Sequence, residues 1–71
     1  MEITVREKVY ATRTETVGDV IYIGEAAIGS SESDSVWRIQ RIDTAGVVET
    51  TWAGGGAFVN AWDDRASLTY N

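Results

Sequence analysis

The stretch of sequence that decides the fold runs from residue 36 to residue 52 and reads VWRIQRIDTAGVVETTW. Residues 36–43 alternate between two faces, which is the period of a β-strand. Asp43 can bond its own backbone and Gly46 can supply a positive φ, so the segment between them favours a tight reversal. We therefore predict a β-hairpin in which residues 47–52 return as the partner strand. The two faces of its first strand carry Trp37, Ile39 and Arg41 on one side and Val36, Arg38, Gln40 and Ile42 on the other.

The residues before this hairpin predict further strands. A turn signal at residues 18–19 precedes the continuous β-branched and aromatic run of residues 20–24, which is typical of a central strand buried on both faces. Residues 3–12 alternate between polar and apolar side chains and predict a half-buried strand. Residues 12–16 are polar and β-tolerant, so they form either a loop or an edge where charge discourages further pairing. The serine-rich residues 30–35 predict a surface loop.

The residues after the hairpin predict a flexible glycine-rich connector and two short elements. Phe58 and Trp62 stand four residues apart, which is consistent with one helical or 3₁₀ turn near residues 58–62. Residues 66–70 predict a short closing strand. The expected fold is therefore all-β, with about five mostly antiparallel strands in a small barrel or two-layer sheet. We expect residues 1–71 to form a single β domain.

The sequence lacks most of the residue types that act in catalysis or bind metals. The chain has no Cys and no His, so disulfides, thiolate metal sites and the commonest general base are absent. The three glycines at 54–56 lack the residues of a phosphate-binding loop. Adjacent residues such as Asp63 and Asp64 usually point apart and make a poor acid–base pair. We expect one of them to cap or close the turn and a carboxylate to hold Arg65, although calcium is conceivable. We expect no enzyme activity, no cofactor and no metal.

The charge and hydropathy of the sequence argue against two classes of partner, nucleic acids and membranes. Six basic and eleven acidic residues give a net charge of −5, which argues against nucleic acid as the main ligand. No apolar run approaches the length of a transmembrane helix, so we expect no membrane partner. The first residues lack the pattern of a signal peptide, and we therefore expect synthesis in the cytoplasm.

Chain length and aromatic content point to assembly with other subunits. In a chain of 71 residues the free energy of apolar burial and the cost of ordering the chain nearly cancel, so partner subunits would stabilise the fold. The three Trp, three Tyr and one Phe would mostly fill the core. Aromatic residues are also enriched in interface hot spots, so we expect one or two of them to face a partner.

Three motifs resemble a family of short proteins from tailed-bacteriophage genomes, which typically lie among virion or structural genes. These motifs are YIGEAAIG at residues 22–29, WRIQRI at residues 37–42 and WDDRASLTY at residues 62–70. The resemblance covers a motif-bearing core of residues 21–70, whereas the N-terminal strand of residues 1–17 lies outside it. It implies a virion component and supplies no catalytic residues.

The expected function is that of a non-enzymatic virion structural protein, located in the virion and binding other virion proteins as a homo-oligomer or multi-copy assembly. A capsid decoration subunit is favoured over a small neck or tail adaptor or fibre-attachment component. The alternative is a module that binds carbohydrate or a host factor through exposed Trp37, Trp52 and Trp62. The candidate interaction residues are Tyr22, Trp37, Trp52, Phe58, Trp62, Asp63, Asp64 and Arg65.

Overall fold

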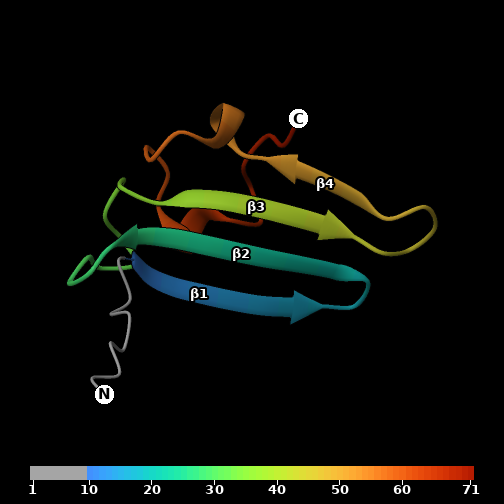
Figure 1. Cartoon of the computed structure of the whole chain (residues 1–71), viewed down its shortest axis with the longest axis horizontal. Helices are drawn as coiled ribbons and strands as arrows, with labels where there is room; N and C mark the ends of the chain where they lie inside the picture. The colour runs from blue at the N-terminus through green and yellow to red at the C-terminus, as the bar shows by residue number, and fades with distance from the viewer. Residues whose placement is uncertain (1–9) are drawn as a thin grey trace, which may run out of the picture.

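A computed structural model of the chain describes residues 10–71 and shows one antiparallel sheet of four strands in the order β1-β2-β3-β4 (Figure 1). The strands are β1 at Tyr10–Val17, β2 at Val20–Ala27, β3 at Arg38–Asp43 and β4 at Glu49–Trp52. Two 3₁₀ turns follow, η1 at Gly54–Gly56 and η2 at Trp62–Asp64. The all-β prediction is confirmed, and the sheet is not closed into a barrel.

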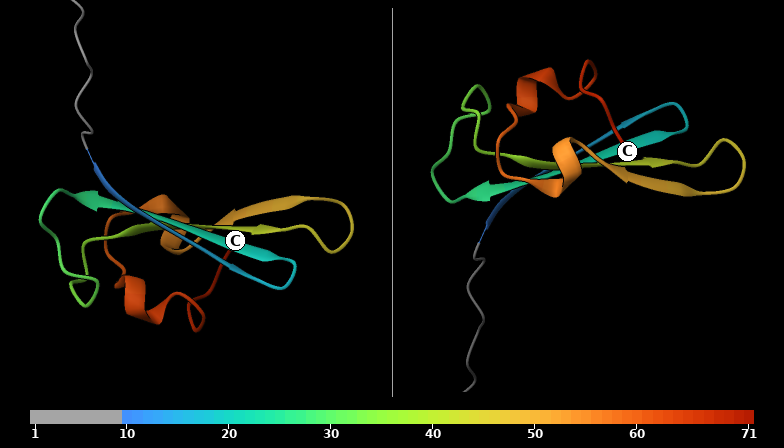
Figure 2. Two further views of the ribbon diagram at one scale, coloured as in Figure 1. Left: turned by 90° about the horizontal axis from the view of Figure 1, so that it is seen from below. Right: turned by 90° about the horizontal axis from the view of Figure 1, so that it is seen from above.

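The sheet has two faces that differ in what lies over them. The segment that carries η2 and the C-terminus crosses one side of the sheet, as both views in Figure 2 show. We call this side the covered face and the other the open face. The strand register assigns to the covered face Ala11, Arg13, Glu15, Tyr22, Gly24, Ala26, Ile39, Arg41 and Ala53. The open face carries Tyr10, Thr12, Thr14, Thr16, Ile21, Ile23, Glu25, Ala27, Arg38, Gln40, Ile42, Thr50 and Trp52.

The hydrophobic core lies between the covered face and the C-terminal segment. Its buried members are Ala26, Trp37, Ile39, Ala53 and Trp62, and the partly buried Ala11, Tyr22, Leu68 and Tyr70 pack against them. Backbone bonds attach the segment at two places. Trp37 and Asn60 exchange N–H···O bonds of 2.7 and 3.1 Å, and Trp52 and Asn71 exchange a second pair of 3.1 Å each. One layer of chain is thus held across one face of one sheet.

Gly24 allows two indole rings to lie against the backbone of β2. A Cβ at this position would stand 2.5 Å from Cε3 of Trp62 and 3.2 Å from Cε3 of Trp37. The two rings pack with centroids 6.2 Å apart and planes inclined by 45°. The predicted strand end at residue 24 is therefore wrong: β2 continues to Ala27, because a glycine inside a strand also marks a close approach of other groups.

Other predictions for the first two strands are partly confirmed. β2 is central, since it pairs with β1 and β3, but its residues 20–23 are only half-buried, so burial on both faces is wrong. Of the predicted strand at residues 3–12, residues 3–9 lie outside the described part of the chain. Residues 12–16 belong to β1, an edge strand, which agrees with the edge alternative. Gly18 takes a φ of 58° in the predicted turn between β1 and β2.

The predicted hairpin is confirmed as β3 and β4, with a longer connection than the tight turn expected. Asp43 Oδ1 accepts a hydrogen bond of 3.0 Å from the Ala45 amide, as predicted, but Gly46 does not take a positive φ. Thr44 donates from its amide and its hydroxyl to the carbonyl of Asp19, at 2.8 and 2.9 Å. These bonds tie the loop to the β1–β2 turn, and the return strand begins only at Glu49.

The C-terminal third departs most from prediction. The connector contains the 3₁₀ turn η1, and residues 58–61 form no helical turn, since the first turn after η1 is η2. The chain is held extended there by its bridge to Trp37. The predicted strand at residues 66–70 is wrong too, because only Tyr70 makes a β-bridge, to Ala53.

Replacing Gly24 with alanine tests whether the tryptophan contact organises the fold. Gly24→Ala would force both indole rings to move, and we expect it to lower the free energy of unfolding by about 1–3 kcal/mol or more. Gly46→Ala is the matched control, because nothing lies within 4 Å of a Cβ there and its φ is not positive. Denaturant unfolding followed by tryptophan fluorescence measures both. Equal stability of the two variants would contradict the role given to Gly24.

Candidate functional site

The open face has an apolar centre that no other part of the described chain covers. Ile21 lies opposite Ile42 across β2 and β3, and Ile23 follows two residues along on the same face. All three isoleucines are half-buried. Next to them, the edge strand β1 contributes a row of exposed threonines, namely Thr12, Thr14 and Thr16. We call Ile21, Ile23 and Ile42 the isoleucine strip. It carries no charge, and the threonine hydroxyl groups of β1 lie along one side of it.

One end of the open face carries an aromatic cluster around a guanidinium group. Arg38 Nε donates to Glu25 Oε1 at 3.1 Å, and its Nη2 binds the same oxygen. The Arg38 guanidinium carbon lies 4.9 Å from the ring centroid of Phe58, 5.4 Å from that of Trp52 and 5.9 Å from that of Tyr10. Phe58 and Tyr10 stack at 5.7 Å. Cation–π contacts and the ion pair together fix Arg38 in the centre of the cluster.

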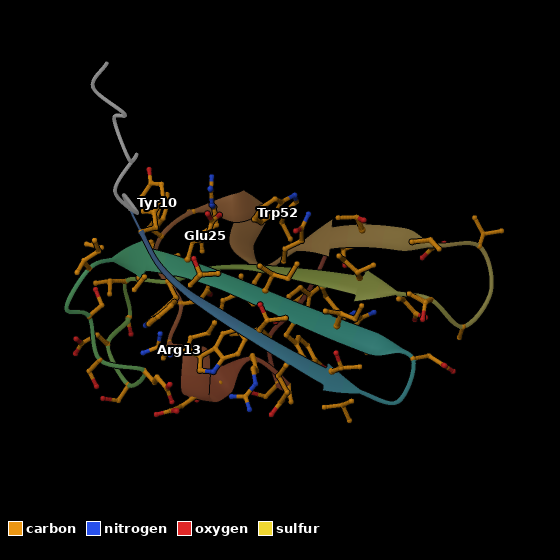
Figure 3. All side chains as sticks on the ribbon, turned by 60° about the horizontal axis from the view of Figure 1, so that its bottom comes forward. Tyr10, Arg13, Glu25 and Trp52 are labelled. Carbon is orange, nitrogen blue, oxygen red and sulfur yellow. The ribbon has the colours of Figure 1, made fainter. Side chains whose placement is uncertain are left out.

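Figure 3 shows the separation of the two faces, with Tyr10, Glu25 and Trp52 on one side of the sheet and Arg13 on the other. β1, β2 and β4 each present one of the first three side chains from the same side. Phe58 joins them from the chain after η1. The cluster is therefore assembled by strand register together with a turn that brings the chain back over β3.

A shallow pocket adjoins this cluster. It encloses about 200 Å³ and is lined by Arg38, Trp52, Gly55 and Gly56. Pockets for small-molecule ligands commonly span about 300–1,000 Å³ and bury most of the ligand. The pocket is open and lies beside two half-buried side chains, so it suits the insertion of one partner side chain better than a substrate.

The ion pairs divide between the two faces. On the open face, Glu25 and Arg38 neutralise each other. On the covered face, Arg13 Nε binds Glu32 Oε2 at 2.7 Å, and its guanidinium carbon lies 5.3 Å from the centroid of the Trp37 ring. The serine-rich loop is thereby attached to β1, and the Trp37 indole nitrogen adds a 2.8 Å bond to the carbonyl of Ser31.

Arg65 is held by a carboxylate, as predicted, but the carboxylate comes from β1. Its Nε and Nη2 bind the two oxygens of Glu15 at 2.9 and 2.8 Å, and its guanidinium carbon lies 4.7 Å from the centroid of the Trp62 ring. The hydrogen bond from Arg65 lowers the pKa of the Glu15 carboxyl, and the same bond raises the pKa of Arg65. Because the pKa of Glu15 is lower in the folded protein than in the unfolded chain, its ion pair stabilises the fold at pH values above the usual Glu pKa. This stabilisation is lost as pH falls through the lowered pKa.

Tyr70 closes the covered face beside this pair. Its hydroxyl donates to the carbonyl of Arg65 at 2.7 Å, and its ring lies 6.1 Å from that of Tyr22. Burial raises the pKa of Tyr70 to about 12, and the neighbouring Tyr22 adds to the increase. Arg41 opposes it, with its guanidinium carbon 5.3 Å from the Tyr70 ring centroid. The phenol is therefore a structural hydrogen-bond donor.

The structure separates the predicted interaction residues into two groups. Trp52 and Phe58 belong to the aromatic cluster of the open face. Trp37 and Trp62 are 0% and 5% exposed, so they are core residues and offer no contact surface. Tyr22 and Arg65 also lie on the covered face. Asp63 and Asp64 are exposed at η2. The carbonyl of Asp64 accepts bonds of 2.9 Å from the amide and the hydroxyl of Ser67, so Asp64 closes a turn through its backbone.

The described residues do not form the carbohydrate platform or the metal site considered from the sequence. A carbohydrate platform of coplanar tryptophans is not formed, since two of the three indoles are buried and Trp52 lies on the opposite face. No group of three acidic residues that could hold a metal ion occurs within residues 10–71. In the same part of the chain, no helix has the length and hydropathy needed to cross a membrane.

Sequence analysis missed the partners of Trp52 and Phe58. Tyr10, Glu25 and Arg38 lie far apart in the sequence, and only strand register brings them together. A signal for one pair was present, because opposite charges at positions 25 and 38 flank the loop between two predicted strands. Adding one residue to the predicted strand of residues 20–24 places these charges opposite each other across β2 and β3.

Comparisons with known proteins found no relative. No protein-family model matches the chain, and searches of curated proteins and of solved structures gave no match either.

An alkaline titration tests the environment of Tyr70. Because its pKa rises to about 12 in the folded protein, the unfolded chain loses this proton first, and the stabilising effect of Tyr70 is lost as pH rises through that value. Phenolate absorbance should show a component near pH 12, and Tyr70→Phe should remove it. Stability should fall less steeply with pH in this variant than in the unaltered protein. A titration unchanged by Tyr70→Phe would contradict the assignment.

Proposed function

We propose that the chain is a non-enzymatic structural subunit of a bacteriophage virion, a capsid decoration subunit, that attaches to another virion protein through its open face. The observation that carries the proposal is the isoleucine strip at the centre of that face, which is half-buried and uncovered. A sheet with apolar residues on both faces needs a layer on each. This chain provides one layer, so a partner protein would provide the second.

The composition of the open face supports a protein partner. Interface centres are depleted in charged residues and enriched in aromatic residues and Arg. The strand residues of the open face have two charged side chains, Glu25 and Arg38, and these are paired with each other. Aromatic side chains surround Arg38 at one end, where the small adjoining pocket is ready to receive one partner side chain. Such an anchor surrounded by near-neutral contacts is the usual arrangement of a hot spot.

The size of the core also favours an assembled state. The buried hydrophobic side chains of the described chain lie on the covered face or in the segment across it. A partner that binds only the folded form stabilises it by mass action, and a decoration subunit meets such a partner at high local concentration on a shell. The virion setting rests on the resemblance of the motifs at residues 22–29, 37–42 and 62–70 to short phage proteins.

Absence of catalysis is part of the proposal. It rests on a sequence without His or Cys and with a single Lys. Three carboxylates of the sheet and serine loop, those of Glu15, Glu25 and Glu32, are each bound to an arginine. The hydrogen bond from Arg65 lowers the pKa of Glu15, which makes that carboxylate poorly suited to accept and return a proton at neutral pH.

Quantification of purified virions tests the proposed location. Particles of a phage that encodes this chain should contain on the order of hundreds of copies, as the symmetry of a shell requires. Quantitative mass spectrometry of gradient-purified particles against a major capsid standard measures this number. About six or twelve copies would instead place the chain at the neck or tail. Its presence in the lysate but not in particles would contradict a structural role.

Two lysine substitutions test the open face as the docking surface. Ile23→Lys puts a charge at the centre of the isoleucine strip, and we expect at least about tenfold weaker binding to particles that lack the chain. Val47→Lys is the matched control, because Val47 is 88% exposed in the β3–β4 loop and the charge change is the same. Binding is measured by co-sedimentation, with thermal melting to establish that both variants fold. Equal binding by both variants would contradict the assignment of the open face.

A further inference from the structure

β1 is a long edge strand whose outer side is unpaired within residues 10–71. Its register with β2 runs without interruption from Tyr10 opposite Ala27 to Val17 opposite Val20, so the edge contains no bulge. The chain has no Pro that would remove a donor from it. Natural sheets usually protect such edges with bulges, prolines, short strands or charged side chains. Of these, β1 has only charged side chains, Arg13 and Glu15. Their signs are opposite, so they oppose pairing with most strands but can pair with each other across two copies of β1.

We propose that β1 is a homodimer interface, in which a second copy of this chain adds its own β1 antiparallel to the first. The two-fold axis passes midway between Thr14 and the partner's Thr14, which face each other. In this register Thr12 faces the partner's Thr16, and Arg13 faces the partner's Glu15. The pairing spans almost all of β1, since Ala11 and the partner's Val17 form its outer pairs. Neither the virion role nor the docking role of the open face is needed for this inference.

A two-fold axis can lie at different residues of β1, and the charges of Arg13 and Glu15 favour the axis at Thr14. Shifting the axis to residue 13 sets Arg13 against the partner's Arg13, and shifting it to residue 15 sets Glu15 against the partner's Glu15. Like charges directly opposite are destabilising in antiparallel pairs, whereas opposite charges and threonine pairs are favourable. An axis at Thr14 gives two Arg–Glu pairs and three threonine pairs, so the sequence of β1 is complementary to itself.

The existing ion pairs of the covered face extend this complementarity. Arg13 is bound to Glu32 and Glu15 is bound to Arg65 in the same chain. In the dimer these pairs join into a row of alternating sign, Glu32, Arg13, the partner's Glu15 and the partner's Arg65. Arg13, Glu15 and Glu32 have side chains that are 40%, 41% and 47% exposed, so each can accept a second partner without burying an unpaired charge. The two-fold axis repeats the row.

The dimer also has a consequence for the open face. A two-fold axis perpendicular to the sheet turns neither copy over, so the two open faces lie on the same side of an eight-stranded sheet. The threonines of the two β1 strands then form its middle, with an isoleucine strip on each side. A flat partner could contact both strips at once.

Charge reversal with mixing tests the interface. Arg13→Glu alone and Glu15→Arg alone each place like charges opposite each other, and sedimentation equilibrium should show at least about tenfold weaker dimerisation for each. An equimolar mixture of the two variants should recover dimers, because every facing pair then has opposite signs. Glu49→Arg, on the far edge strand β4, makes the same charge change as Glu15→Arg and should leave dimerisation unaltered. Monomers at all concentrations of the unaltered chain, or no recovery on mixing, would overturn the inference.

Single cysteines test the register in a chain that has none of its own. In T14C the two new thiols face each other, and facing Cα atoms about 4.5–5.5 Å apart are within reach of a disulfide. In T12C the equivalent atoms are four residues apart along the strands, about 13 Å, which is too far. Mild oxidation should therefore cross-link T14C and leave T12C monomeric on a denaturing gel. Equal cross-linking of the two variants, or cross-linking of T12C alone, would overturn the proposed register.

Discussion

The structure depends on the contact between Gly24 and the rings of Trp37 and Trp62. The only large fully buried side chains of the described residues are Trp37 and Ile39, and Trp62 fills the space beside them. These indoles can approach β2 this closely only because no Cβ stands at position 24. Arg65 covers Trp62, Arg13 covers Trp37, and their carboxylate partners tie β1, the serine loop and the C-terminal segment together. A small chain thereby obtains a dense core from two large side chains.

Because the core is built on one side of the sheet, the other face stays open. Within residues 10–71, the segment after η1 crosses one side of the sheet, and no second segment covers the isoleucines on the other side. The isoleucines of the open face remain half-buried, whereas the aromatic cluster around Arg38 closes only one end. A one-sided core, a neutral open face and an unprotected edge are three features of the same arrangement. A partner chain would complete each of these features of residues 10–71, which is the basis of the proposed assembly.

The hairpin and the alternation of its first strand could be predicted because both depend on local sequence. Turn-forming Asp43 and the two-residue period act within a few residues of one another. Predictions failed where a distant group decided the outcome. Gly24 indicated a strand end until two tryptophans from far along the chain explained why a glycine must stand inside the strand. Phe58 and Trp62 have helical spacing, yet they lie on opposite faces of the sheet. Phe58 stacks on Tyr10, whereas Trp62 packs at an inclined angle against Trp37.

The sequence by itself determined an all-β protein with a central strand before a hairpin, and a chain almost without catalytic side chains. These properties follow from short-range periodicity and from composition, which do not depend on contacts between distant parts of the chain. Only the tertiary structure decided which aromatics are core and which are surface, because burial depends on the side of the sheet that the C-terminal segment crosses. It also decided that Arg13 and Glu15 lie together on the covered side of a free edge, since strand order, not strand sequence, makes β1 an edge.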